Sequence, residues 1–249
     1  MRLAVFVGAL ALMGLWELLA PARQATVFRP FRWFNNLGLI ACGTALVWLV
    51  MPLLPLGAAQ LAEQRRWGLF NRVSWPFEVE LLLAFVILDF MIYLQHAAFH
   101  FIPQLWRLHR VHHADVDVDA STGVRFHPLE LVLSMCVKLG AVFLLGAHWI
   151  AVLAFELALN AVTIFNHANV SVPGDSWLRW LVVTPDMHRV HHSTASDETD
   201  SNFGFNLPWW DRLLGTYRAA ARHSTLGLAQ YRSGARQSLG WMLTLPFKP

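Results

Sequence analysis

The stretch LVLSMCVKLGAVFLLGAHWIAVLAFELALNAVTIFN, residues 131–166, decides the fold of this chain. As one continuous α-helix it would be about 54 Å long, far more than the roughly 30 Å of hydrocarbon in a bilayer. Gly140, Gly146 and the polar His148 lie near its middle. The stretch therefore predicts a hairpin of two short helices, which enters the membrane and returns to the same side.

Three further segments are apolar enough to cross a bilayer. Leu37–Ala59 contains no charged residue. Leu3–Ala20 is interrupted only by Glu17, and we expect it to be a retained anchor because no typical small-residue cleavage site follows it. Leu81–Phe101 carries Asp89 and ends in two histidines. Together with the hairpin, these segments predict an all-α integral membrane helical bundle.

The composition agrees with a membrane protein. Of the 249 residues, 56% are hydrophobic and only 14% are charged, whereas a soluble domain carries roughly 25% charged residues. This excludes a disordered chain and a coiled coil. The cations are almost all Arg beside apolar segments, so the formal charge of +3 indicates juxtamembrane positions rather than nucleic-acid binding. Cys42 and Cys136 both fall in apolar stretches, which argues against disulfides and Cys-type zinc sites.

The hairpin also predicts on which side of the membrane the histidines lie. If the chain returns, residues 107–128 and everything after His167 share one side with the end of the segment Leu81–Phe101. Arginines accompany that side, and positively charged loops are typically cytoplasmic, so we expect a cytoplasmic histidine-rich cap. These arginines are Arg107, Arg110, Arg125, Arg179 and Arg189. Tryptophans among the arginines after Asn169 predict that the cap lies at the membrane interface.

Three groups of histidines have helical spacing. On a helix, residues three and four apart lie on one face, so each group aims its imidazoles at one point. Neutral imidazole suits iron, zinc, copper and nickel, and eight rings exceed the four ligands of one tetrahedral zinc. The pattern therefore predicts two metal ions, with both His-Arg-Val-His-His motifs supplying ligands to both. The groups are His96 and His100; His109, His112 and His113; and His188, His191 and His192.

Single polar residues allow more than one interpretation. His127 and His167 have no partner at helical spacing, so each can be a metal ligand or an isolated polar residue. Asp89 lies two turns before His96 on the same face, where it can support a ligand imidazole as an outer partner or make a polar contact between helices. We expect His148 and His223 to be interfacial residues without a metal.

With these motifs the chain resembles the membrane-bound fatty acid hydroxylase and sterol desaturase superfamily, whose members share three histidine boxes and a di-metal centre. The matching strings lie within residues 85–218. They are His96-Ala-Ala-Phe-His100, Trp106-Arg-Leu-His109-Arg-Val-His112-His113-Ala-Asp115, Arg125-Phe-His127-Pro-Leu-Glu130, Phe165-Asn-His167-Ala-Asn169, Thr184-Pro-Asp-Met-His188-Arg-Val-His191-His192, Asn202-Phe-Gly204 and Trp210-Asp-Arg-Leu-Leu-Gly215-Thr-Tyr217.

The resemblance implies a membrane enzyme that uses two non-haem irons, molecular oxygen and electrons to hydroxylate or desaturate a lipid carbon. The chain has no His-Pro-Gly-Gly haem motif, so a separate protein is expected to donate the electrons. Zinc can replace iron in purified samples. The implied metal ligands are His96, His100, His109, His112, His113, His167, His188, His191, His192 and, in a string typical of the sterol-desaturase branch, His127.

The resemblance also suggests a division of the chain. We expect N-terminal transmembrane helices at residues 1–80, a fatty acid hydroxylase-type catalytic region at 81–218, and a C-terminal interfacial tail at 219–249, all continuous with one another. Attack on an unactivated C–H bond requires a redox metal with open positions, which independently favours iron over a closed zinc site.

The alternative from another functional class is a non-catalytic di-metal membrane protein or a component of metal transport. Transport predicts polar residues along a path through the bilayer, whereas Leu37–Ala59 offers only Thr44. Within the enzyme class, hydroxylation and desaturation both stay open. The substrate can be a sterol, a fatty acyl chain, a carotenoid, an ether lipid or a sphingoid base.

Overall fold

The computed structural model of the chain describes residues 2–223 and 225–248. Within these residues the chain is helical, and β structure is limited to two isolated bridges. The long helices of this described part are α1 (Arg2–Leu19), α2 (Arg29–Val50), α4 (Phe77–Phe101), α6 (Pro128–Leu145) and α7 (Trp149–His167). The prediction of an all-α bundle is therefore confirmed.

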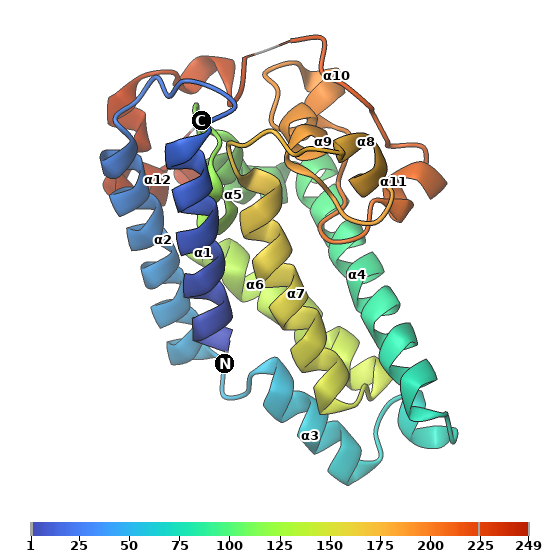
Figure 1. Ribbon diagram of the computed structural model, residues 1–249. Coiled ribbons are helices and arrows are strands. Elements are labelled where there is room, and N and C mark those ends of the chain that lie inside the picture. Colours follow the sequence, from blue (N-terminus) through green and yellow to red (C-terminus); the bar gives the residue numbers. More distant parts are fainter. Residues whose placement is uncertain (1, 224, 249) are drawn as a thin grey trace.

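Short elements cover the two ends of the bundle (Figure 1). The lower end in that view carries α3 (Pro55–Arg65), followed by η1 (Phe70–Arg72). The remaining short elements form a cap at the upper end. They are α5 (Pro103–His113), η2 (Ala120–Val124), α8 (Asp175–Leu178), α9 (Pro185–His191), α10 (Ser196–Thr199), α11 (Trp209–Leu213), η3 (Ala229–Tyr231), η4 (Gly234–Gln237), α12 (Leu239–Thr244) and η5 (Leu245–Phe247).

The stretch 131–166 forms the predicted hairpin of α6 and α7. Gly146 ends α6 with φ +64°, a left-handed conformation that glycine adopts without steric cost. A Cβ on Gly146 would lie 2.2 Å from the carbonyl oxygen of Trp67, so the close approach of residues 67–68 also requires glycine here. His148 then caps α7 by accepting a hydrogen bond from the backbone N–H of Ile150. This turn fixes the direction in which the chain returns.

Helix α2 differs from the span predicted at Leu37–Ala59. It begins at Arg29 and ends at Val50. Pro52 and Pro55 follow, and proline lacks the N–H that a helix interior needs, so the chain breaks there and restarts as α3 with Pro55 in its first turn. The helix starts earlier than predicted because the polar residues of its first turns are buried against the cap.

Four segments are long and apolar enough to cross a membrane: α1, the segment Arg29–Arg72, α6 and α7. Helix α4, where the sequence predicts a crossing at Leu81–Phe101, is not among these four. It is nevertheless one continuous helix that runs beside α7 through the bundle (Figure 1). It also contacts α5 and α6, and it buries Asp89 and His96. Helix α4 thus brings polar groups into the middle of the molecule.

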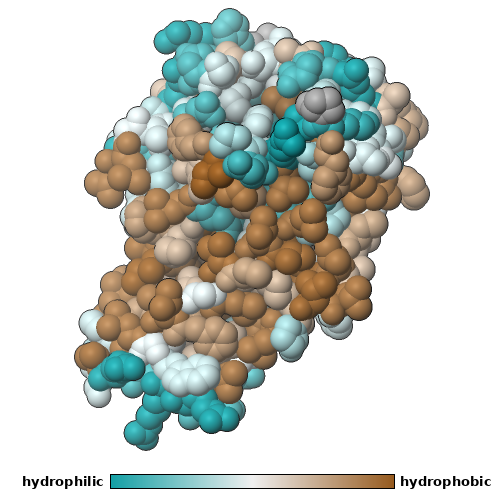
Figure 2. Space-filling model, turned by 180° about the vertical axis from the view of Figure 1, so that it is seen from behind, coloured by the Kyte–Doolittle hydropathy of each residue, from teal (hydrophilic) through white to brown (hydrophobic). Residues whose placement is uncertain are grey.

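Apolar side chains form a belt across the middle of the face that Figure 2 shows, with hydrophilic residues at both ends. Leu12 on α1, Trp48 on α2 and Leu144 on α6 are 61%, 74% and 75% exposed. Soluble proteins rarely expose apolar surface of this extent, whereas lipid covers it without cost. The chain is therefore an integral membrane protein.

The direction of the helices places the histidine-bearing segments at one end. Helices α1, α4 and α7 end at the upper end of the bundle, where α6 begins (Figure 1). Residues 102–127 and the chain after His167 therefore lie there together. His148 is at the opposite end, between α6 and α7. The prediction that the clustered histidines share one side is confirmed.

Candidate metal centre

Four helices deliver histidines to the upper end of the bundle. His96 and His100 lie one turn apart at the end of α4, and α7 ends at His167. Helix α5 begins with Pro103 in its first turn and carries the first His-Arg-Val-His-His motif. Helix α9 carries the second motif as far as His191, with His192 directly after it, and Thr184 caps the helix by accepting a hydrogen bond from Met187 N–H. Both motifs are therefore helical, as their spacing predicts.

The histidines form two compact groups, and in each the ligand-capable atoms all lie within 4.8 Å of one another. The first histidine group takes members from α4, α5 and α9, and the second takes members from α5, α7, α9 and the residue that follows α9. Each His-Arg-Val-His-His motif contributes to both groups. The first histidine group is His96, His100, His109, His113 and His191; the second is His112, His167, His188 and His192.

Contacts between the rings fit a shared cation. The Nε2 atoms of His96 and His109 are 3.1 Å apart. His167 Nε2 lies 3.1 Å from His112 Nε2 and 3.0 Å from His188 Nε2. A neutral imidazole carries a single N–H, so His167 cannot satisfy both neighbours while its other nitrogen donates elsewhere. Lone pairs that converge in this way are what a metal ion requires.

Other ring nitrogens are buried without a hydrogen-bond partner. An unpartnered buried polar atom costs free energy, and a native structure keeps one where it has a use. Six of the nine histidines carry such atoms, so the donor set fits divalent metal. The atoms are Nε2 of His100, His113 and His191, Nδ1 of His112 and His188, and both ring nitrogens of His192.

Burial sets the protonation state of the cap histidines. It lowers the pKa of His188, His191 and His192 well below the ordinary value of 6.5, and neighbouring histidines lower it further. Burial alone lowers the pKa of His109 to about 3. At neutral pH these rings are therefore uncharged, which is the form of imidazole that binds metals.

Backbone carbonyls orient three of the rings from outside. His96 Nδ1 donates to the carbonyl of Phe203 at 2.8 Å, and His191 Nδ1 donates to that of Ser201 at 2.7 Å. His167 Nδ1 donates to the Thr163 carbonyl at 2.7 Å. A carbonyl can only accept, so the proton is on Nδ1 and the Nε2 lone pair points inward. Outer partners of this kind fix the tautomer and direction of a metal-binding histidine.

The strings around Asn202 and Asp211 build the loop that supplies two of these carbonyls. Asn202 adopts φ +53° and donates through its side chain to the carbonyl of Met187 on α9. The Asp211 carboxylate accepts from the backbone N–H groups of Phe203 and Gly204 at 2.8 and 2.9 Å. These contacts hold residues 201–204 against His96 and His191. The strings around Asn202 and Asp211 therefore position this loop and do not themselves offer metal ligands.

Glu130 is a site residue that the sequence analysis did not assign. Its Oε1 lies 2.6 Å from His109 Nδ1, and its Oε2 is buried without a hydrogen-bond partner. A carboxylate that accepts from a ligand histidine raises the basicity of that ligand. Asp200 contacts His100 Nδ1 in the same way at 3.1 Å. Glu130 is the single acidic residue of α6, which is the signal that could have identified it.

His127, which the resemblance offers as a further ligand, belongs to neither histidine group. Its Nδ1 caps α6 by accepting from the backbone N–H of Leu129, and its Nε2 donates to the Leu243 carbonyl at 3.3 Å. Both ring nitrogens are used. His127 therefore begins α6 and ties it to α12.

Of the two readings for Asp89, the structure favours the contact between elements. The carboxylate accepts from Asn206 Nδ2, Leu207 N–H and Trp210 Nε1 at 2.9, 3.2 and 2.8 Å. These partners lie in the loop before α11 and in α11 itself. Asp89 anchors the loop that carries Phe203, whose carbonyl in turn accepts from His96 Nδ1.

Two buried groups of histidines at the end of a lipid-facing bundle define a membrane protein with a candidate metal site. The fatty acid hydroxylase family matches residues 81–216, more than half of the chain. The chain belongs to this family, within the fatty acid hydroxylase and sterol desaturase superfamily, as the histidine strings indicated.

Curated relatives extend the similarity. An ornithine lipid hydroxylase of Rhizobium tropici is 29% identical over 230 residues, which cover 89% of this chain and 68% of the relative. Human alkylglycerol monooxygenase is 28% identical over 160 residues, or 64% of this chain and 35% of the relative. A putative Delta(7)-sterol-C5(6)-desaturase of Arabidopsis thaliana is 28% identical over 142 residues, or 54% and 46%. No solved structure matches the chain. The relatives are lipid hydroxylases, monooxygenases and desaturases, which supports an oxidoreductase.

Proposed function

We propose that this chain is a membrane-bound non-haem di-iron oxygenase that hydroxylates or desaturates a lipid C–H bond with molecular oxygen. The observation that carries the proposal is the set of nine buried histidines in two groups, with unpartnered ring nitrogens facing one another. The family and its lipid-oxidising relatives support the same chemistry.

Iron, when bound, would supply the redox chemistry that activates oxygen toward an unactivated C–H bond. The residues of the two histidine groups would hold it. The protein itself keeps these rings neutral by burial and fixes His96, His167 and His191 through carbonyls. Enclosing the site also excludes water that would quench an oxidant.

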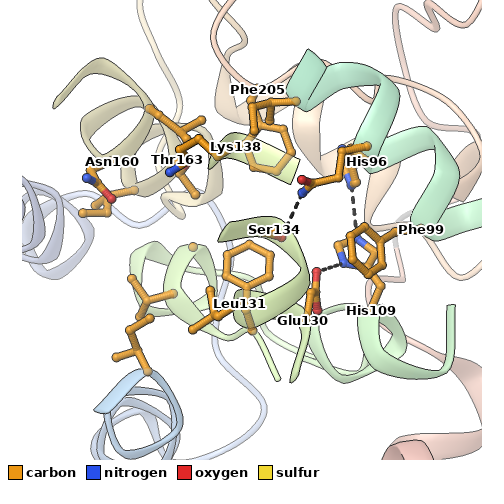
Figure 3. A pocket seen from close by; sticks show the side chains of 18 of the residues that line it. His96, Phe99, His109, Glu130, Leu131, Ser134, Lys138, Asn160, Thr163 and Phe205 are labelled. Carbon is orange, nitrogen blue, oxygen red and sulfur yellow. Dashed lines mark hydrogen bonds and ion pairs between the residues drawn. The ribbon is translucent and has the colours of Figure 1, made fainter. Parts of the chain in front are cut away.

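A cavity beside the first histidine group offers a place for the substrate (Figure 3). Its volume is about 180 Å³, and it lies between α1, α2, α4, α6 and α7. His96 and His109 line one end, together with Phe99, Phe126 and Phe205. Because the cavity is inside the apolar belt, a lipid can enter from the bilayer without crossing water.

Further parts of the proposal concern sidedness, partners and the organisation of the chain. We place the histidine end in the cytoplasm, where a separate protein donates electrons, and we assign no role in nucleic-acid binding. We keep the division into transmembrane helices at 1–80, a catalytic region at 81–218 and an interfacial tail at 219–249. The metal ligands proposed are the nine histidines of the two groups.

Lipid analysis tests this function against a non-catalytic metal-binding role. Lipids of a host with and without the chain would be compared by mass for a gain of one oxygen or a loss of two hydrogens. We expect a new product with the wild-type chain and none with His188→Ala. Purified protein with two irons but no change in any lipid, under oxygen and a supply of electrons, would favour the non-catalytic alternative.

A further inference from the structure

We propose that the cavity recognises a lipid that bears a carboxylate, and that Lys138 binds this carboxylate inside the apolar belt. The inference rests on the proposed function, because the lipid would be the substrate of the histidine site. It starts from a polar stripe that the histidine motifs do not explain.

Helices α6 and α7 each present polar residues at helical spacing on one face. On α6, Glu130, Ser134 and Lys138 follow one another at intervals of four residues, and all three line the cavity (Figure 3). On α7, Asn160 and Thr163 line it as well. Polar side chains at membrane depth are costly and therefore functional by default. Glu130 pairs with His109 and Ser134 accepts from Gln95, but a cavity for a plain hydrocarbon chain would need no charged Lys138.

The stripe leads to a group of three charged side chains, of which Glu156 is buried while Lys138 and Arg2 are 15% and 37% exposed. Lys138 Nζ lies 3.1 Å from Glu156 Oε1, and Arg2 Nη2 lies 2.9 Å from Glu156 Oε2. The Glu156 side chain is 1% exposed. Replacing buried ion pairs by apolar residues is often neutral or stabilising, so stability alone does not account for these charges. Two cations share one carboxylate, which leaves a positive charge available to a second anion.

Lys138 is well placed to use that charge. Its ammonium has three N–H donors, and Glu156 takes one of them. The side chain lines the same cavity as His96 and His109. Eight residues separate it from Glu130, the partner of His109, which corresponds to about 12 Å along α6. An anion bound at Lys138 would therefore hold the lipid chain so that a carbon some way from the anion lies beside the histidines.

The size of the cavity favours a small anionic group. A cavity of about 150 Å³ is filled by a molecule of the size of benzene. The 180 Å³ available here thus admits a carboxylate and part of a chain. Lys138 is the single cation among the lining residues, which matches the single charge of a carboxylate better than the charge of about −1.5 to −2 on a phosphate monoester, so we assign the site to a carboxylate.

Binding of chain-matched probes tests this assignment without any oxidation. Tritiated palmitic acid, methyl palmitate and hexadecyl phosphate would be bound to the purified full-length protein in detergent, both metal-free and zinc-loaded. We expect the acid to bind about 10- to 100-fold more tightly than the ester, the range for one charge-assisted hydrogen bond. Equal affinity for acid and ester, or tighter binding of the phosphate, would overturn the assignment.

Variants separate recognition from folding. Lys138→Met should remove the preference for the acid, and Lys138→Arg should keep most of it. Lys138→Met with Glu156→Gln removes both charges, so no unpaired carboxylate remains buried, and it should also lose the preference. Leu133→Met, on the lipid-facing side of α6, is the control that should bind like wild type. A preserved preference in both Lys138→Met variants would refute the proposal.

The two hypotheses fail in different ways. If lipid analysis finds no oxidised product while the acid still binds through Lys138, the oxygenase function is wrong and the carboxylate site stands. If the product forms but Lys138→Met changes neither binding nor product, the function stands and the carboxylate site is wrong.

Discussion

Two buried polar regions lie side by side in the upper part of the molecule, and they differ in how their polar atoms are satisfied. One is the pair of histidine groups, in which six rings carry unpartnered nitrogens. The other, the Arg32 network, joins the start of α2 to the loop between α5 and α6. It consists of Arg32, Asn36, Asp115, Asp119, Ser121, Thr122 and Arg125.

The Arg32 network is almost fully paired. Arg32 donates through Nε and Nη2 to the two oxygens of Asp115, both at 2.8 Å, and through Nη1 to Asp119 at 2.7 Å. Asp119 also accepts from the N–H of Ser121. Within the network, Arg125 Nη2 is the atom left without a partner. Paired polar networks fix one arrangement of the chain, whereas converging unpartnered nitrogens need a ligand. The comparison indicates a structural role for the Arg32 network and supports the proposed metal binding by the histidine groups.

The largest effect is expected where one ligand is removed from each histidine group. His112→Ala combined with His191→Ala should abolish product formation and lower iron from the proposed two ions per chain toward none. The protein should still elute as a folded species, because the Arg32 network is intact. Iron determined on anaerobically purified protein, together with lipid mass analysis, gives the readout. Unchanged iron content would show that the two groups are not the metal site.

His148 and His167, the two single histidines of the hairpin, provide a second test of the metal site. His167 belongs to the second histidine group, whereas His148 lies at the other end of α7 with its Nε2 4.0 Å from Glu63. His167→Ala should abolish product and lower metal content. His148→Ala should leave both close to wild type. The reverse pattern would contradict the topology and the site together.

Disrupting the Arg32 network should lower the free energy of unfolding of the protein. Arg32→Met leaves Asp115 and Asp119 buried without their shared cation, which should lower the free energy of unfolding by about 3–5 kcal/mol. Arg107→Met, at an exposed position on α5, is the matched control and should change it little. Denaturant titration in mixed micelles measures both variants. Equal stability of the two would mean that the network contributes no net stabilisation.

Acid should affect the two regions in different pH ranges. Burial lowers the pKa of His109 to about 3, so the unfolded chain binds more protons below pH 6.5 and the metal-free protein loses stability as pH falls from 6.5 toward 3. Burial opposes ionisation of Asp115, but Arg32 and Arg125 hold its pKa below the ordinary 3.8, so its contribution is lost only below that pH. His109→Asn should therefore flatten the stability curve between pH 6.5 and 3.8. An unchanged slope would contradict this interpretation.

The smallest effect is expected at the cysteines. Cys42 and Cys136 are exposed free thiols on α2 and α6, and neither belongs to a histidine group. Cys42→Ser and Cys136→Ser should leave iron content and product within error of wild type. Loss of metal in either variant would mean that the set of ligands is incomplete.

Local spacing explains why much of the site could be predicted from the sequence. Intervals of three and four residues on a helix hold wherever the helix lies, so the His-Arg-Val-His-His motifs could be recognised before any contact was known. The length of residues 131–166 against the thickness of a bilayer likewise fixed the hairpin, and with it the common side of the histidines.

The roles of other residues depend on partners that are distant in sequence, so only the tertiary structure showed these roles. Glu130 meets His109 across 21 positions, and Asp89 meets Trp210 across 121. His127 shares a string with Glu130 but caps a helix, because its neighbours in space are Leu129 and Leu243.

The sequence by itself therefore determined an all-helical membrane bundle with its clustered histidines on one side. Only the folded chain decided how nine rings divide into two groups, which carbonyls and carboxylates orient them, and that Lys138 and Glu156 meet inside the apolar belt. The physical reason is that helix periodicity and hydrophobic length are properties of short segments. Ligand geometry, by contrast, depends on contacts between helices that are far apart in sequence.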